Sequence, residues 1–279
     1  MITWKLPFTA LCWVLLGASD LTLAQVQPVR PAVPLPGRPA ANSQLFVPPI
    51  PPNRGAPGRR KGAASRGECL TGDKSLTALV PATEIPMSQA ATAGTPTEAV
   101  WGLTVAERPT LWFYVPDALT SEHPLEFVLL DEQDNYLYKT SFTAARTPSG
   151  IISLSLPATV APLVVGKQYH WFFSVYCGPQ QPGRYMSVNG SIQRVVPNAT
   201  LKQQLVATTQ AQRIPLYAAH GIWHEALTTV AQLRRADPHN AALAASWRSL
   251  LKAIDLETLA AEPLVPCCTP SPEINQLRK

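Results

Sequence analysis

Short apolar runs separated by proline, glycine and polar turn residues fill the chain from about residue 67 to residue 197. The stretch 169–178 shows the pattern most clearly. Alternate residues of a strand share one face, and one face of this stretch is apolar throughout, comprising Tyr169, Trp171, Phe173, Val175 and Cys177. Residues 150–156 alternate in the same way. The pattern predicts strands with one face in a core.

The turn signals indicate how these strands connect. Residues 131–135 (DEQDN) separate two apolar runs, which is typical of a hairpin loop. Turn residues recur about every ten positions, as they do in antiparallel sandwiches. We therefore expect an antiparallel β-sandwich, Ig-like or similar, over residues 67–197, with a small barrel as the alternative.

The periodicity changes to that of helices over residues 198–262. Asn198 and Asn240 stand where helix N-caps are expected. Pro215 is expected to break the first helix, and Pro238 to follow the end of a later one. The fold class that follows is α+β, with the C-terminal helices packed on the sandwich.

Part of this helical segment has the spacing of a tetratricopeptide repeat, in which small residues let two antiparallel helices approach closely. The matching positions are Tyr217, Gly221, Ala226 and Pro238. Only one such unit is visible, whereas a repeat array needs about three. A helical hairpin packed on the sheet is the favoured interpretation, and a peptide-binding repeat module is the alternative.

The N-terminus has the features of a secretory signal peptide over residues 1–24. Lys5 precedes an apolar run from Phe8 to Ala18, and Thr22-Leu23-Ala24 offers a cleavage site. The run is shorter than the roughly 20 apolar residues that span a bilayer. We expect cleavage and no transmembrane span afterwards, with a retained anchor as the alternative.

Residues 25–66 are rich in proline and carry seven basic residues and no acidic one. The whole chain has a net charge of only +5, so the basic character belongs to this segment, and nucleic-acid binding is not expected. The composition predicts a disordered linker. It could also tether the protein to an anionic surface through Arg54, Arg59, Arg60, Lys61 and Arg66.

Four cysteines remain after signal removal, and an exported chain with four cysteines favours disulfides. The candidates are Cys69, Cys177, Cys267 and Cys268, the last two in a flexible tail over residues 263–279. A bond between the two neighbouring cysteines would be strained. Bonds from the tail to Cys69 and Cys177 are favoured, and the pairing is left open.

The sequence offers little catalytic chemistry. It has no nucleophile elbow of a serine hydrolase and no glycine-rich phosphate loop. His220 and His224 have helical metal-pair spacing but no third ligand nearby, and residues 131–135 do not match a calcium loop. We therefore expect no catalytic residues, no metal and no cofactor.

Aromatic side chains are the remaining candidates for a binding surface. Those that face outward from a sheet could stack on sugar rings or anchor a protein partner. The candidates for such a surface are Trp112, Tyr114 and Tyr176. Packing within the core and on the sheet faces is the alternative for all three.

Several segments in order resemble one family, the domain of unknown function 928: "PTLWFYVP", "YHWFFSVYC" and "LYAAHGIWHEALTTVAQLRR" are the most specific. The resemblance covers roughly residues 58–260 and implies a cyanobacterial exported protein. It supplies no activity and no ligand.

The expectation is therefore a non-catalytic binding module, located in the periplasm, at the cell surface or outside the cell, with a protein or glycan partner. The alternatives are a hydrolase of envelope polymers and a structural component of the envelope.

Overall fold

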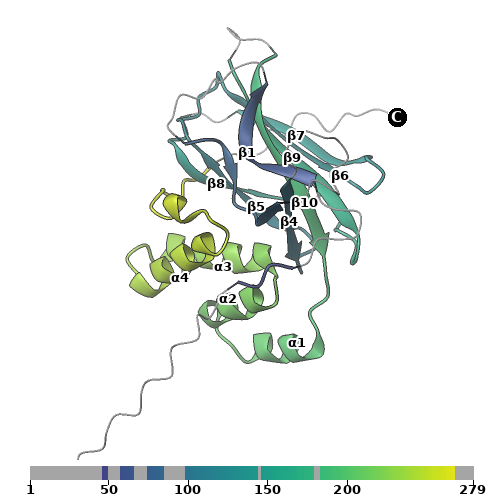
Figure 1. The fold of residues 1–279 in the computed structure, drawn as a ribbon, viewed down its shortest axis with the longest axis vertical. Helices are drawn as coiled ribbons and strands as arrows, with labels where there is room; N and C mark the ends of the chain where they lie inside the picture. Colours follow the sequence, from purple (N-terminus) through teal and green to yellow (C-terminus); the bar gives the residue numbers. More distant parts are fainter. Residues whose placement is uncertain are drawn as a thin grey trace, which may run out of the picture. The chain divides into compact units, whose positions relative to one another are not determined.

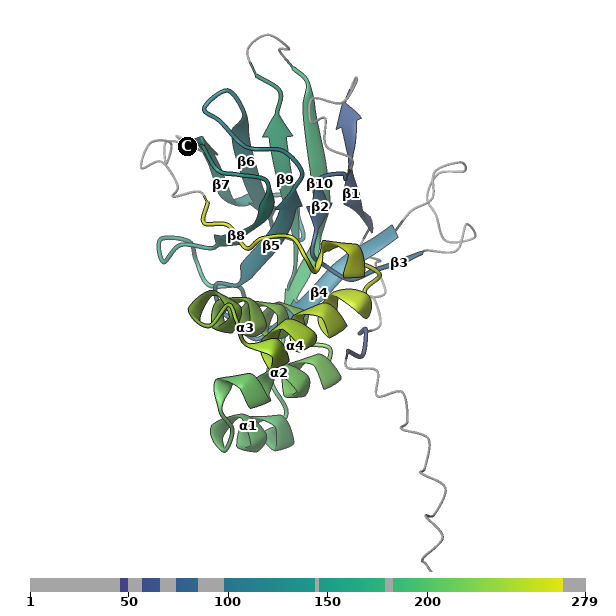
Figure 2. The same ribbon diagram turned by 90° about the vertical axis from the view of Figure 1, so that its left-hand side faces the viewer.

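The computed structural model describes residues 46–49, 57–65, 74–84, 98–143, 146–178 and 183–267. The signal peptide at residues 1–24 lies outside these residues. Ten strands in the described part form one sheet, and four α-helices follow them (Figures 1 and 2). The strands are β1 (Pro57–Ser65), β2 (Thr77–Ala78), β3 (Ala82–Glu84), β4 (Glu98–Thr104), β5 (Thr110–Val115), β6 (Pro124–Leu130), β7 (Tyr136–Thr143), β8 (Gly150–Ser155), β9 (Gln168–Tyr176) and β10 (Tyr185–Arg194).

The predicted antiparallel sandwich is wrong. The strands follow the order β7-β6-β9-β10-β4-β1-β2-β5-β8 in a single sheet, and the pairing of β10 with β4 is parallel. The sheet curls into a half-barrel, so strands that are not neighbours in it face each other. Phe113 of β5 stacks on Phe173 of β9 with ring centroids 4.3 Å apart. The alternating pattern shows which residues are buried, but it is the same for a curled sheet and for two facing sheets.

The predicted hairpin at residues 131–135 is confirmed. β6 and β7 pair in antiparallel fashion on either side of this loop. The Asp131 carboxylate accepts hydrogen bonds from the backbone N–H groups of Gln133 and Asn135 at 2.8 and 2.9 Å. Hydrogen bonds from the Asn135 side chain, together with these backbone bonds, lower the pKa of Asp131. The carboxylate therefore organises the turn.

Two hydrophobic clusters lie on opposite faces of the sheet. The inner cluster fills the curl and includes Phe113, Phe127, Trp171, Phe173 and Val188. The helix-side cluster joins the other face of β5 and β8 to the helices and includes Trp112, Ile151, Trp223 and Trp247. The strand alternation predicted for residues 169–177 is confirmed, because all five residues of its apolar face are at most 7% exposed.

The C-terminal helices are confirmed in position and in their packing on the sheet. They are α1 (Ala199–Val206), α2 (Gln210–Ala219), α3 (Trp223–Ala236) and α4 (Ala241–Lys252), followed by the 3₁₀ turn η1 (Glu257–Leu259). Asn198 and Asn240 cap α1 and α4 as predicted. The break predicted at Pro215 is wrong: this residue lies inside α2, and the chain turns earlier, where Thr209 begins α2 with a capping box.

The boundaries predicted for the disordered linker are also wrong where the structure describes them. Residues 57–65 form β1, which pairs with β4, β2 and β10 in turn. A Cβ at Gly58 would lie 2.7 Å from the Asn189 carbonyl oxygen, so the glycine permits this close pairing. Further upstream, Phe46 is fully buried, with its ring centroid 4.8 Å from that of Trp223. The composition predicted a linker, but backbone pairing holds β1 in the sheet. Composition does not encode such pairing, so the prediction missed it.

Candidate functional site

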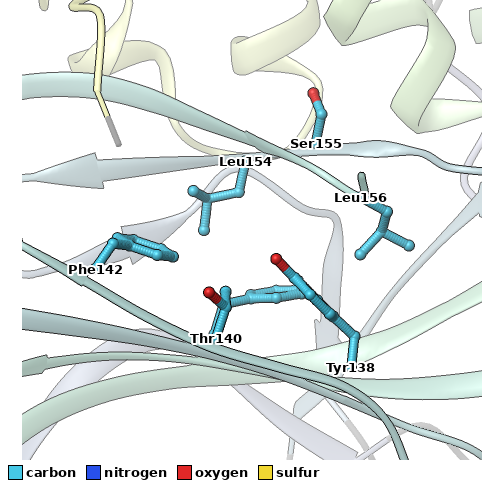
Figure 3. Close-up of a pocket in the computed structure, with 7 residues that line it drawn as sticks. Tyr138, Thr140, Phe142, Leu154, Ser155 and Leu156 are labelled. Carbon is cyan, nitrogen blue, oxygen red and sulfur yellow. The ribbon is translucent and has the colours of Figure 1, made fainter. Parts of the chain in front are cut away.

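The two ends of the sheet leave an opening between β7 and β8. These strands are consecutive in the sequence, yet β7 pairs with β6 and β8 pairs with β5, and they do not pair with each other. The curl of the sheet brings its two ends face to face, and a cavity of about 320 Å³, counting its open mouth, lies between them (Figure 3). We call this opening the seam, defined by its lining residues Phe127, Tyr138, Thr140, Phe142, Leu154, Ser155 and Leu156.

The seam is mainly apolar, and three of its lining residues, Tyr138, Thr140 and Ser155, carry hydroxyl groups. Leu154 of β8 and Leu156, just after β8, point toward Tyr138, Thr140 and Phe142 of β7 (Figure 3). Within the part of the chain that the structure describes, the Tyr138 and Thr140 hydroxyls make no side-chain hydrogen bond. No acidic or basic side chain lines the seam. Such a lining suits an uncharged or apolar group and offers no acid–base pair for catalysis.

The outer backbone edge of β8 borders the seam. The Ile151 N–H donates to Pro263 O at 2.8 Å, and the Val265 N–H donates to Ile151 O at 2.9 Å. On the other side, the Leu156 N–H donates to Pro109 O, next to β5. Because backbone groups alternate in direction along a strand, Ser153 and Ser155 point their N–H and C=O groups outward, as Ile151 does. Among the described residues, the outer edge of β8 is paired only at Ile151.

A second polar group is buried where α3 meets the sheet. The Glu225 carboxylate accepts hydrogen bonds through Oε1 from Thr104 Oγ1 at 2.6 Å, from Ala106 N at 2.9 Å and from Val105 N at 3.1 Å. Burial raises the pKa of Glu225, and the hydrogen bonds oppose that rise. The carboxylate therefore caps the end of β4 from the helix layer. Sequence reasoning missed this role, although Glu225 stands in the first turn of a helix, where acidic residues are favoured.

His224 is buried next to this carboxylate. Its side chain is 2% exposed, and burial lowers its pKa to about 4. A Cβ at Gly102 would lie 2.9 Å from His224 Nε2, so the ring packs tightly against β4. This crowding makes His224 a packing residue.

The helical histidine pair is split between two environments. His220 ends α2, where its Nδ1 lies 2.8 Å from Leu216 O, while His224 is buried in α3. The described residues hold no group of three potential metal ligands.

Two of the three aromatics predicted to form a binding surface are buried, which is a correction. Trp112 is 1% exposed and Tyr114 is 4% exposed, because the helices cover this face of β5. Trp112 Nε1 donates to Thr228 Oγ1 of α3 at 3.0 Å. Tyr176 is half-buried, and its hydroxyl donates to Glu126 at 3.3 Å. These aromatics do not form one exposed platform.

The basic residues predicted to form a tether are also separated. The Arg60 side chain is 9% exposed and donates through Nη1 to the Ile254 carbonyl oxygen, which corrects its assignment to a tether. Burial lowers the pKa of Arg60, while nearby Glu98 and Asp255 oppose that shift. Arg59 and Lys61 are exposed on the same strand. Arg54 and Arg66 lie outside the described residues.

Two cysteines fall within the described residues. Cys177 follows β9 and is 7% exposed, and Cys267 packs against the inner cluster. Both are disulfide-bonded. Cys69 and Cys268 lie outside the described residues, and the pairing stays a prediction.

Across the described residues, no helix is long and apolar enough to cross a membrane.

Searches against known proteins give one informative result. No curated protein matches the sequence. The profile of one family, described as "Domain of Unknown Function (DUF928)", matches residues 61–264. That range runs from β1 to the segment beside β8 and covers most of the chain, so this protein belongs to the DUF928 family.

Proposed function

We propose that this protein is an exported, non-catalytic interaction protein of the cell envelope, which binds an extended segment of a protein partner in the seam between β7 and β8. The seam carries the proposal. It combines an apolar lining and three hydroxyl-bearing residues with a bordering strand whose outer edge is largely unpaired among the described residues. An extended peptide can satisfy such an edge through its backbone and place alternate side chains in the cavity.

A protein partner is favoured over a glycan. Sugar binding by stacking needs exposed aromatic rings, and the helices bury Trp112 and Tyr114. In the seam, the Phe127 and Phe142 side chains are 2% and 3% exposed, so they offer little ring surface to a sugar. The edge of β8 instead presents backbone donors and acceptors, which suit a peptide.

A peptide-display selection followed by a blocking variant tests the binding site. Ten-residue peptides selected on the mature chain should alternate apolar and polar residues, and their affinity can be measured as free fluorescent peptides. Thr140→Trp fills the seam and should weaken binding at least about tenfold. Lys139→Trp adds the same ring to a neighbouring exposed position and should leave binding unchanged. Selection of no peptide, or equal affinity for both variants, would refute the proposal.

Export is tested separately. The proposal rests here on the charged, apolar and small-residue regions of residues 1–24. Fusing these residues to a phosphatase that is active only outside the cytoplasm should give activity. Replacing Leu15 and Leu16 by arginine should abolish that activity because it interrupts the apolar run. Equal activity in both fusions would contradict export.

A further inference from the structure

A short proline-rich segment, residues 46–49, lies on the turn that joins α2 to α3 (Figure 1). Phe46 is fully buried, and its ring meets the Trp223 ring edge to face, with the centroids 4.8 Å apart. The Val47 N–H donates to Ala218 O at 3.1 Å, while the Val47 side chain is 51% exposed. A buried aromatic ring and a backbone hydrogen bond therefore fix the segment on the helix layer.

The residues that face the turn are three positions apart. Pro49 follows Phe46 by three residues, and a Cβ at Gly221 would lie 3.3 Å from its Cδ. The two residues between them are exposed. A polyproline II helix has three residues per turn, so it places such positions on one face, and residues before a proline favour this conformation. The segment therefore has the recognition pattern of a proline-rich peptide on an aromatic surface, with the motif Phe-x-x-Pro.

Other parts of the chain build the surface that receives this segment. Trp223 Nε1 donates to Leu79 O at 2.7 Å, which fixes the indole ring from the sheet side. α2 ends in a Schellman motif, in which the N–H groups of Gly221 and Ile222 donate to carbonyl oxygens of its last turn at 3.1 and 2.9 Å. Gly221 has a φ of +70°, and a Cβ there would lie 3.0 Å from the Val47 carbonyl oxygen. The surface is therefore formed by contacts that do not involve residues 46–49.

We propose that this surface is a second binding site, which takes a partner peptide with the motif Phe-x-x-Pro and which residues 46–49 occupy as a resident ligand. We call it the corner site, defined by Ala218, Gly221 and Trp223. It shares no residue with the seam and does not depend on the function proposed there. The resident segment reduces the affinity for a partner by the fraction of molecules in which it stays docked. A partner that adds further contacts to the motif displaces it.

Opening the corner site in the full mature chain tests the proposal. Phe46→Ala removes the buried ring, and Val47→Pro removes the N–H that donates to Ala218 O. Each variant should bind a fluorescent peptide of residues 43–50 about tenfold or more tighter than the wild type does, as measured by anisotropy. Val47→Ala alters only an exposed side chain and should match the wild type. Val47→Pro keeps the buried ring, so it decides the test if Phe46→Ala does not fold. No gain in affinity in the folded opened variants would overturn the proposal.

Two glycines with similar backbone conformation show where the peptide binds. Gly221 and Gly166 have φ values of +70° and +80°, but a Cβ at Gly166 would meet nothing within 4 Å. In the Val47→Pro chain, Gly221→Ala should weaken peptide binding about tenfold or more, and Gly166→Ala should not. Equal affinity in these two folded variants, or equal binding of a peptide with alanine in place of its phenylalanine, would overturn the corner site. Loss of binding on Thr140→Trp would instead place the peptide in the seam, which would refute the corner site and support the proposed function.

Discussion

The Glu225 carboxylate of α3 lies 2.6 Å from Thr104 Oγ1 of β4 and also accepts the two backbone N–H groups that follow Thr104. Removing this carboxylate would take an acceptor from three donors where the helices meet the sheet, of which the Ala106 N–H also has a second acceptor in Thr104 Oγ1 at 3.1 Å. We expect Glu225→Ala to lower the free energy of unfolding by about 2–4 kcal/mol in urea titrations. Glu225→Gln, which keeps an acceptor oxygen, is the matched control. Equal losses for both variants would contradict the role of the accepted hydrogen bonds.

The same carboxylate should make stability depend on pH. Its folded-state pKa is raised by burial, so its contribution to stability is present below the ordinary glutamate pKa and is lost as the pH rises through the raised value. Glu225→Gln carries no charge at any pH. Its free energy of unfolding should therefore improve relative to the wild type between pH 4 and pH 8. If the difference in unfolding free energy between the wild type and Glu225→Gln stayed constant across this pH range, the raised pKa would be refuted.

His224 should make the stability of the fold depend on pH in the opposite direction. Burial lowers its pKa from 6.5 to about 4, so its contribution is present above pH 6.5 and is lost as the pH falls toward 4. The shift corresponds to about 3 kcal/mol. His224→Gln does not titrate, so the wild type should lose about this much more stability than the variant between pH 7 and pH 4, as measured by urea unfolding.

Two neighbouring arginines of β1 should contribute unequally to the free energy of unfolding. Arg60 is buried and bonded to Ile254 O, whereas Arg59 is exposed. We expect Arg60→Ala to cost about 2–3 kcal/mol of unfolding free energy, and Arg59→Ala to stay within about 0.5 kcal/mol. If Arg60 were part of a mobile tether, both substitutions would be neutral.

The disulfides should join the C-terminal cysteines to Cys69 and Cys177. Cys177 and Cys267 are both disulfide-bonded, and a bond between the neighbours Cys267 and Cys268 would be strained. We therefore expect each of these two neighbours to pair with Cys69 or Cys177, which non-reducing digestion and mass spectrometry would identify. Cys177→Ser should then lower the free energy of unfolding by about 2–4 kcal/mol. A linked peptide joining Cys69 to Cys177 would refute this prediction.

Local signals predicted the local structure well. The caps at Asn198 and Asn240 depend on a side chain and N–H groups two or three residues away. The buried face around Trp171 depends only on alternation within one strand. Both are therefore visible in a single stretch of sequence.

Features set by distant segments were not predictable in this way. Trp112 looked exposed because nothing in β5 shows that α3, more than 100 residues later, covers it. The seam was missed for a similar reason. Its residues alternate as in any half-buried strand, and only the sheet order reveals that β7 and β8 remain apart.

The pairing of β1 with β10 also has a consequence for biosynthesis. Arg59 is made early, yet its partner Asn189 is added 130 residues later. The interior of the sheet therefore stays incomplete until the last strand has left the ribosome, since contacts so distant in sequence form late and slowly. A nascent chain with this order of synthesis remains open for most of its production, which is the condition that the proposed export through a translocation channel would require.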